Sequence, residues 1–228
     1  MAAAATAPTF RFFTSTIGKK YIMGITGLIW AGFVLVHMAG NMLILVGASA
    51  YNNYAHALEK TPITPIVEVI LIASVIAHVA CAISLTRQNR KARGPQRYTQ
   101  NTNGQKAIYT PARLMAVQGS LILAFLVLHL AGFKYGTYYE TTVDGVVMRD
   151  LHRLVIEIFK QPGYLAWYVF SLCLLAFHLS HGVGSTIQSL GILNDRMAPN
   201  VKRISLIYGF GVAAGFIVQP LYVFFIAG

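Results

Sequence analysis

Five long runs of apolar residues alternate with short polar segments along the chain. The runs cover 21–46, 65–85, 112–133, 163–190 and 204–227. Each is long enough for a helix that crosses a bilayer core of about 30 Å, which takes about 20 residues. The segments between them, such as "ASAYNNY", "KYGTYYETTVDG" and "LNDRMAPNVKR", hold the Gly, Pro, Asn and Asp residues typical of connections. The pattern predicts an all-α integral membrane protein with five transmembrane helices and one membrane domain, 1–228.

Composition agrees with this prediction. The chain has 228 residues, of which 56% are hydrophobic and only 11% are charged, and its mean hydropathy is +0.58. An ordinary soluble domain is less apolar and more highly charged. Both cysteines, Cys81 and Cys173, lie inside apolar runs, so the sequence offers neither a disulfide framework nor a C-x-x-C metal site.

Positive charges gather in three polar segments: the N-terminal arm and the segments that follow 65–85 and 163–190. Thirteen of the eighteen Lys and Arg residues lie there: Arg11, Lys19, Lys20, Arg87, Arg90, Lys91, Arg93, Arg97, Lys106, Arg113, Arg196, Lys202 and Arg203. Because cytoplasmic loops carry an excess of Lys and Arg, we expect these segments and the N-terminus inside and the C-terminus outside. The net charge of +11 therefore indicates topology and a basic docking face, and no nucleic-acid partner is expected.

Histidines recur inside the apolar runs, where a polar side chain normally needs a partner. "FVLVHMAGNMLILV" holds His37, "IAHVACAI" holds His78, "LVLHLAGF" holds His129, and "AFHLSHGV" holds His178 and His181. At the helical rise, His37 and His129 lie about 26 and 24 Å from the cytoplasmic ends of their helices, and His78 lies about 14 Å from its own. The corresponding values for His178 and His181 are about 17 and 12 Å, so depth alone leaves open which of them pairs with His78.

Two facing imidazoles at equal depth are the axial ligands that a b-type haem needs. Small residues about one turn after each candidate leave room for a macrocycle on the same helix face: Gly40, Gly132, Gly182, and Cys81 with Ala82 after His78. Alternatively, each histidine is a buried structural side chain, although four matched in depth disfavour this reading. A path for ions is the other alternative, but such paths usually bring membrane-embedded carboxylates, and only Glu68 lies in a predicted span.

Several motifs resemble one family when they are taken together in order and spacing. They are "STIGKKYIMGITGL", "HMAGN", "YNNYAHALEKTP" and "FHLSHG". With the five-helix layout, they make essentially the whole chain similar to the di-haem cytochrome b membrane anchors of bacterial succinate:quinone oxidoreductases, in the fumarate reductase superfamily. The resemblance implies that the first four helices form a bundle around two stacked b haems.

The resemblance also assigns the ligands. It implies that His37 and His129 hold the haem nearer the outside, while His78 and His178 hold the haem nearer the cytoplasm. His181 would then lie beside the ring edge, bonded to a propionate or a backbone carbonyl. Fumarate-reducing relatives place a glutamate two residues before the fourth-helix ligand, where this chain has Ala176, which favours succinate oxidation.

The implied function is that of a membrane anchor and electron-transfer subunit of succinate dehydrogenase in the bacterial cytoplasmic membrane. By this resemblance it has no catalytic activity alone and carries electrons through two b haems to a quinone, expected to be menaquinone. A flavoprotein and an iron–sulfur subunit would dock on the basic cytoplasmic face. Candidate quinone contacts are Ser15 and Lys19 near the inner end and Asn41 and Glu59 near the outer end; each also suits a helix-end or headgroup contact.

Two other functions remain open from the sequence. One is a di-haem cytochrome b anchor of a hydrogenase or a formate dehydrogenase. The active subunits of such enzymes usually lie outside, whereas the basic face predicted here is cytoplasmic. The other is a haem-free transporter or channel with a path lined by histidines.

Overall fold

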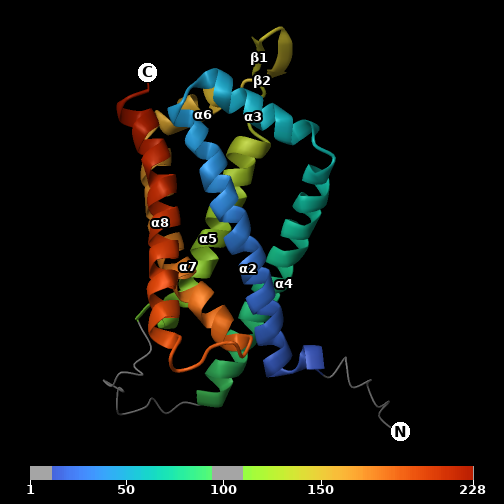
Figure 1. Ribbon diagram of the computed structural model, residues 1–228, viewed down its shortest axis with the longest axis vertical. Coiled ribbons are helices and arrows are strands. Elements are labelled where there is room, and N and C mark those ends of the chain that lie inside the picture. The colour runs from blue at the N-terminus through green and yellow to red at the C-terminus, as the bar shows by residue number, and fades with distance from the viewer. Residues whose placement is uncertain (1–11, 94–109, 228) are drawn as a thin grey trace.

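Five long helices make up most of the structure, a computed structural model that describes residues 12–93 and 110–227 (Figure 1). They are α2 (Thr16–Asn41), α4 (Ile63–Arg93), α5 (Thr110–His129), α7 (Pro162–Ser189) and α8 (Ala198–Phe225). A 3₁₀ turn, Met42–Leu45, continues α2, and a π-helical turn, Leu130–Lys134, continues α5. All five are long and apolar enough to cross a membrane. The predicted fold class is confirmed, and the chain is a multi-pass membrane protein.

The helices extend beyond the apolar runs that predicted them. α2 begins at Thr16, because the Ser15 side chain caps it by accepting a hydrogen bond from the Gly18 amide at 3.0 Å. α4 continues to Arg93, well past the predicted end of that run. Hydrophobicity marks only the part of a helix that lies in hydrocarbon, whereas backbone hydrogen bonds carry the same helix into polar surroundings.

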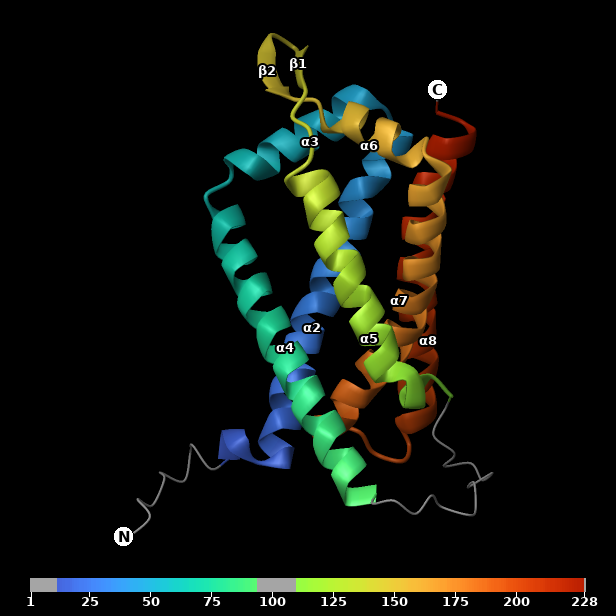
Figure 2. The same ribbon diagram turned by 180° about the vertical axis from the view of Figure 1, so that it is seen from behind.

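The helices alternate in direction along the chain and pack side by side (Figures 1 and 2). α8 lies along α7, α2 packs on both α4 and α7, and α5 packs on α7. Gly209 permits the close crossing of α8 and α7, since a Cβ there would lie 2.6 Å from the Ala176 carbonyl oxygen. The Tyr208 hydroxyl donates to the Ala31 carbonyl and ties α8 to α2.

Large apolar side chains cover the outward surfaces of the long helices. On α4, Ile66, Val69 and Ile76 are each at least 60% exposed, and on α8 Ile207 is 73% exposed. Such a surface is unfavourable in water, but in a bilayer it meets lipid chains that are equally apolar. The exposure pattern therefore agrees with the membrane assignment.

One end of the bundle, the capped end, is covered by short elements that the apolar pattern did not predict. They are α3 (Ala48–Lys60), α6 (Leu151–Phe159) and a hairpin of β1 (Glu140–Val143) and β2 (Val146–Arg149) (Figure 2). Asp144 and Gly145 form the hairpin turn, both with positive φ, as a tight two-residue turn requires. α3 and α6 lie over a buried cluster that includes Ile44, Leu154 and Val223.

The opposite end of the bundle, the basic end, holds the start of α2, the end of α4 and the α7–α8 connection. Its described basic side chains are Lys19, Lys20, Arg87, Arg90, Lys91, Arg196, Lys202 and Arg203. Arg11, Arg97 and Lys106 of the predicted basic face lie outside the described residues. Six of the seven acidic residues lie at the capped end, so the two ends differ in charge as the sequence indicated.

Candidate functional site

The structure brings the four predicted histidines together as two facing pairs. His37 of α2 and His129 of α5 form the capped-end pair, with ring centres 5.8 Å apart. His78 of α4 and His178 of α7 form the basic-end pair, with ring centres 6.5 Å apart. Two imidazoles that bind one iron from opposite sides, with nitrogen–metal bonds of about 2 Å, have ring centres about 6 Å apart. Both separations fit that geometry.

His37 lies between the Asn41 amide and a stacked phenylalanine ring. The Asn41 amide nitrogen lies 3.3 Å from His37 Nδ1 and donates to the His37 carbonyl oxygen at 2.8 Å. Phe33 stacks on the imidazole, with ring centres 5.2 Å apart and ring planes at 14°. These contacts restrict rotation of the ring about its side-chain bonds.

His129 lies in an aromatic cluster formed by α5 and α7. Its Nδ1 is 3.1 Å from the Tyr168 hydroxyl, and Phe125 and Phe133 lie one turn before and after it with ring centres at 5.8 and 5.4 Å. Tyr168 is buried at 6% exposure. The apolar surroundings keep water from this end of the site, and the tyrosine hydroxyl is the polar group that orients the ring.

His78 is oriented by the backbone of α2. Its Nδ1 lies 3.1 Å from the Met23 carbonyl oxygen and 3.1 Å from the Thr26 hydroxyl, which itself donates to the Ile22 carbonyl. A carbonyl can only accept, so the contact favours the tautomer with hydrogen on Nδ1. Nε2 is then left with a free lone pair, as a metal ligand needs.

His178 is the histidine of α7 whose ring faces His78. Its Nδ1 is buried and has no hydrogen-bond partner among the described residues. Burying an imidazole nitrogen without a partner costs free energy. Glycines let both basic-end rings lie close to neighbouring helices: a Cβ at Gly27 would be 3.4 Å from His78 Cε1, and one at Gly119 would be 3.6 Å from His178 Cε1.

His181 lies one turn from His178 and is half-buried. An open cavity of about 430 Å³ lies between the start of α2 and the end of α7, lined by Ile17, Lys20, Met23, Ser185, Gln188 and Ser189. Because the Met23 carbonyl also contacts His78, the cavity adjoins the basic-end pair. Its lining combines one cation, two hydroxyls and an amide with apolar side chains.

The small residues predicted to make room for a macrocycle differ in their surroundings. Among the described residues, no atom lies within 4 Å of a Cβ placed at Gly182, and Gly132 has only an ordinary contact with Ile158. A Cβ at Gly40, by contrast, would overlap the Tyr54 ring, with Cε1 at 2.6 Å. Gly40 therefore serves the packing of α3 on α2, while clearance at Gly132 and Gly182 stays a prediction.

The four candidate quinone contacts are not brought together. Ser15 caps α2, and the Lys19 ammonium donates to the Ser84 hydroxyl at 2.9 Å, both at the basic end. At the capped end, Asn41 donates to His37 and accepts a hydrogen bond from Tyr51 at 2.7 Å. Glu59 is exposed on α3. Three of the four side chains thus have structural contacts, and a quinone role for any of them stays a prediction.

The sequence did not single out four residues of the site: Thr26, Tyr51, Tyr168 and Gly119. All four meet histidines or Asn41 across helices, so their sequence spacing carries no signal. Thr26 is a polar residue in an apolar run and could have been noticed for that reason. Among the described residues, no three His, Cys, Asp or Glu side chains lie close enough to hold a metal ion together.

Fold and site together define a multi-pass helical membrane protein with two pairs of facing histidines between its helices. The chain is similar to the succinate dehydrogenase cytochrome b558 subunit of Bacillus subtilis (strain 168), with 23% identity over 189 residues, which cover 82% of this chain and 84% of that protein. The resemblance that the motifs indicated is thereby confirmed. No protein-family model matches the chain, and no solved structure matches it significantly.

Proposed function

We propose that this protein is the membrane anchor and electron-transfer subunit of a succinate dehydrogenase, through which electrons pass from an iron–sulfur subunit by way of two b haems to a quinone. The observation that carries the proposal is the pair of ring-centre separations, 5.8 and 6.5 Å. Similarity to a cytochrome b subunit over 82% of the chain supports the same conclusion.

The residues present fit two haems. His37 and His129 would hold one, and His78 and His178 the other. Among the described residues, the buried Trp30 Nε1 on α2 has no hydrogen-bond partner. A carboxylate of a bound cofactor could accept a hydrogen bond from it.

The cavity at the basic end suits the carboxylates of a haem held by the basic-end pair. The Lys20 ammonium can form a charge-assisted hydrogen bond with a carboxylate, and the Ser185 and Ser189 hydroxyls can donate to one. Haem, when bound, supplies one-electron oxidation and reduction, while the protein sets its position, ligation and surroundings. This chain's part is to fix four imidazoles, exclude water with aromatic side chains and offer the Lys20 ammonium to a carboxylate.

We propose that the basic end faces the cytoplasm and receives the iron–sulfur and flavoprotein subunits. The excess of Lys and Arg at this end supports both parts of the proposal. The basic-end pair then lies nearer to the docked subunits, and the capped-end pair lies nearer to the opposite surface. Among the candidate quinone contacts, Glu59 at the capped end has an exposed carboxylate. The quinone is expected to be menaquinone.

Ala176 supports succinate oxidation as the direction of the reaction. It is only 3% exposed, at the place where α7 crosses Gly209 of α8. A carboxylate at this position would have to be buried between two tightly packed helices, at a considerable cost in free energy. The helix crossing therefore does not favour a proton path at this position.

The proposal is tested on the complex purified from native membranes through a tag on this chain. We expect a flavoprotein and an iron–sulfur protein to co-purify, and succinate to reduce the bound haem. In stopped-flow spectra, His78→Ala should abolish rapid reduction of the remaining haem, whereas His37→Ala should preserve it. Equal rates in both variants would refute the proposed order, and co-purification with hydrogenase or formate dehydrogenase subunits would refute the assignment.

A further inference from the structure

Asn41 joins His37 to the helix that covers the capped end. Its amide nitrogen donates to the His37 carbonyl oxygen at 2.8 Å and lies 3.3 Å from His37 Nδ1. Its amide oxygen accepts a hydrogen bond from the Tyr51 hydroxyl at 2.7 Å. The His37 carbonyl can only accept, so it fixes the amide nitrogen on the His37 side, and the Tyr51 hydroxyl anchors the amide by donating to its oxygen.

Tyr51 lies in α3, outside the membrane-spanning helices, and is buried at 5% exposure. Burial, with a smaller contribution from Tyr54, raises the pKa of Tyr51 above its ordinary value. The hydroxyl therefore keeps its proton and can donate to Asn41. The ring packs in the cluster under α3 and α6 and meets His152 edge to face, with ring centres 6.2 Å apart.

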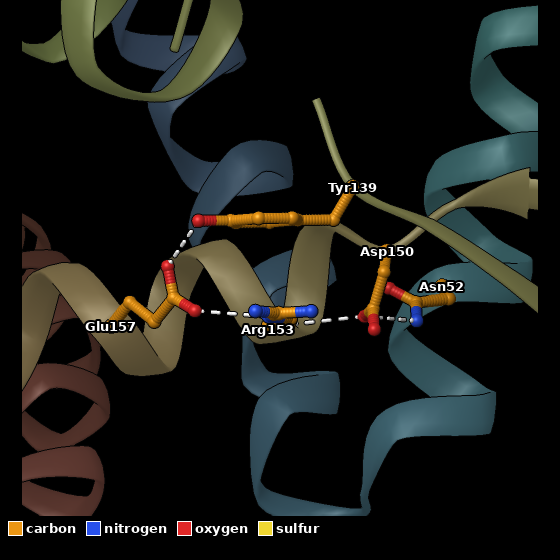
Figure 3. Close-up of polar contacts among 5 residues, drawn as sticks. All are labelled: Asn52, Tyr139, Asp150, Arg153 and Glu157. Atoms are coloured by element: carbon orange, nitrogen blue, oxygen red, sulfur yellow. Dashed lines mark hydrogen bonds and ion pairs between the residues drawn. The ribbon is translucent and has the colours of Figure 1, made fainter. Parts of the chain in front are cut away.

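Asn52, next to Tyr51, fastens α3 to the segment that begins α6 (Figure 3). Its amide nitrogen donates to the Asp150 carboxylate at 2.8 Å, and its amide oxygen accepts from the His152 backbone amide at 2.9 Å. Asp150 also caps α6 by accepting from the Arg153 amide at 3.1 Å. Asn52 is only 1% exposed, so loss of this junction would leave buried polar groups unpaired.

We infer that Tyr51 is a positioning residue of the His37 imidazole, acting through Asn41, and that the Asn52–Asp150 junction holds Tyr51 in place. The inference deepens the proposed function and rests on it, because it concerns the haem that His37 and His129 would bind. An amide that loses this anchor holds the neighbouring imidazole less firmly, and loss of such groups around a ligand typically lowers the affinity for the bound group 10- to 100-fold. The basic-end pair has no contact with these residues and should be unaffected.

Tyr51→Phe tests the inference because it removes one hydroxyl and keeps the packed ring. In the purified complex, we expect the capped-end haem to lose part of its low-spin signal, to bind carbon monoxide when reduced, and to shift in midpoint potential. Its transfer to a haem scavenger should become about tenfold faster. The basic-end haem should keep its spectrum and potential.

Asn52→Leu and Glu157→Gln complete the series. Asn52→Leu should change the same haem in the same direction, because it breaks the junction one residue from Tyr51. Glu157→Gln is the matched control: Glu157 belongs to the same polar cluster but contacts Arg153 and Tyr139 rather than Tyr51 or Asn52 (Figure 3). It should leave both haems as in the wild-type protein.

The outcomes separate this inference from the proposed function. A wild-type complex without haem would overturn both. A wild-type complex with two haems, and a Tyr51→Phe variant identical to it in carbon monoxide binding, potential and haem transfer, would overturn the inference alone. Equal changes at both haems would also overturn it, because they would indicate a general loss of structure. If Asn52→Leu fails to assemble, Tyr51→Phe still decides.

Discussion

The two histidine pairs are held in different ways. At the capped end, both imidazoles contact side chains, Asn41 and Tyr168, and lie among Phe33, Phe125 and Phe133. At the basic end, His78 contacts a backbone carbonyl as well as a hydroxyl. Within the part of the chain that the structure describes, His178 Nδ1 has no hydrogen-bond partner, and glycines bring neighbouring helices close to both rings.

The difference indicates which changes should harm each pair. Side-chain hydrogen bonds depend on single groups, so loss of one hydroxyl should disturb the capped-end pair. A backbone carbonyl and close helix packing depend on the spacing of helices, so a bulkier residue should disturb the basic-end pair.

The largest effect is expected where a histidine itself is replaced. His178→Ala should abolish the spectral band of the basic-end haem, because it removes one of two axial ligands. His181→Ala, one turn away on the same helix, should retain that band and change only the potential. Visible spectra and redox titration of both variants give the answer, and the reverse result would make His181 the ligand.

A change of helix spacing should come next in size. Gly27→Leu places a side chain where a Cβ would already lie 3.4 Å from the His78 ring, so we expect overpacking of about 1–3 kcal/mol and loss of much of the basic-end haem. Gly32→Leu is the matched control on α2, because no described atom lies within 4 Å of a Cβ there. The haem content of the two purified variants measures the contrast. Equal content would show that Gly27 does not set the spacing.

Loss of a single hydroxyl should have a moderate effect that differs between the pairs. Tyr168→Phe removes the contact to His129 Nδ1 and should shift the potential of the capped-end haem by about 20–65 mV, equivalent to about 0.5–1.5 kcal/mol. Thr26→Val leaves His78 its backbone carbonyl and should shift the basic-end haem less. Redox titration measures both shifts. A larger shift in Thr26→Val would reverse the contrast.

The smallest effect concerns His152, at the capped end. Burial lowers the pKa of His152 below its ordinary value, and nearby Asp150 offsets this in part. Between the folded and unfolded pKa values the unfolded chain binds more protons, so stability should fall slightly as pH decreases below about 6.5. The thermal unfolding temperature, measured at several pH values, should depend less on pH in His152→Gln. If the unfolding temperature of His152→Gln depended on pH as strongly as that of the wild-type protein, His152 would not be the cause.

Much of the fold could be predicted from the sequence, because apolar runs report directly on helices in lipid. The same runs gave the approximate depth of each histidine, and the structure does pair His37 with His129 and His78 with a histidine of α7. Depth could not choose between His178 and His181, since the choice depends on rotation of α7 about its axis.

The capped end was not predictable in the same way. α6 is nine residues long, and the hairpin strands have four residues each, so neither gives a long periodic signal. Contacts such as Tyr51 with Asn41, or Tyr168 with His129, join helices whose relative rotation the sequence does not specify. Gly40 is a further example. The sequence could not indicate that Tyr54 of α3 packs against it.

The most direct test of the account is the number of haems per chain. A pyridine haemochrome assay of the purified complex, set against the amount of this chain from quantitative amino-acid analysis, gives that number. Two facing histidine pairs predict two protohaems per chain. One haem per chain would show that one of the pairs does not bind haem, and none would contradict the account as a whole.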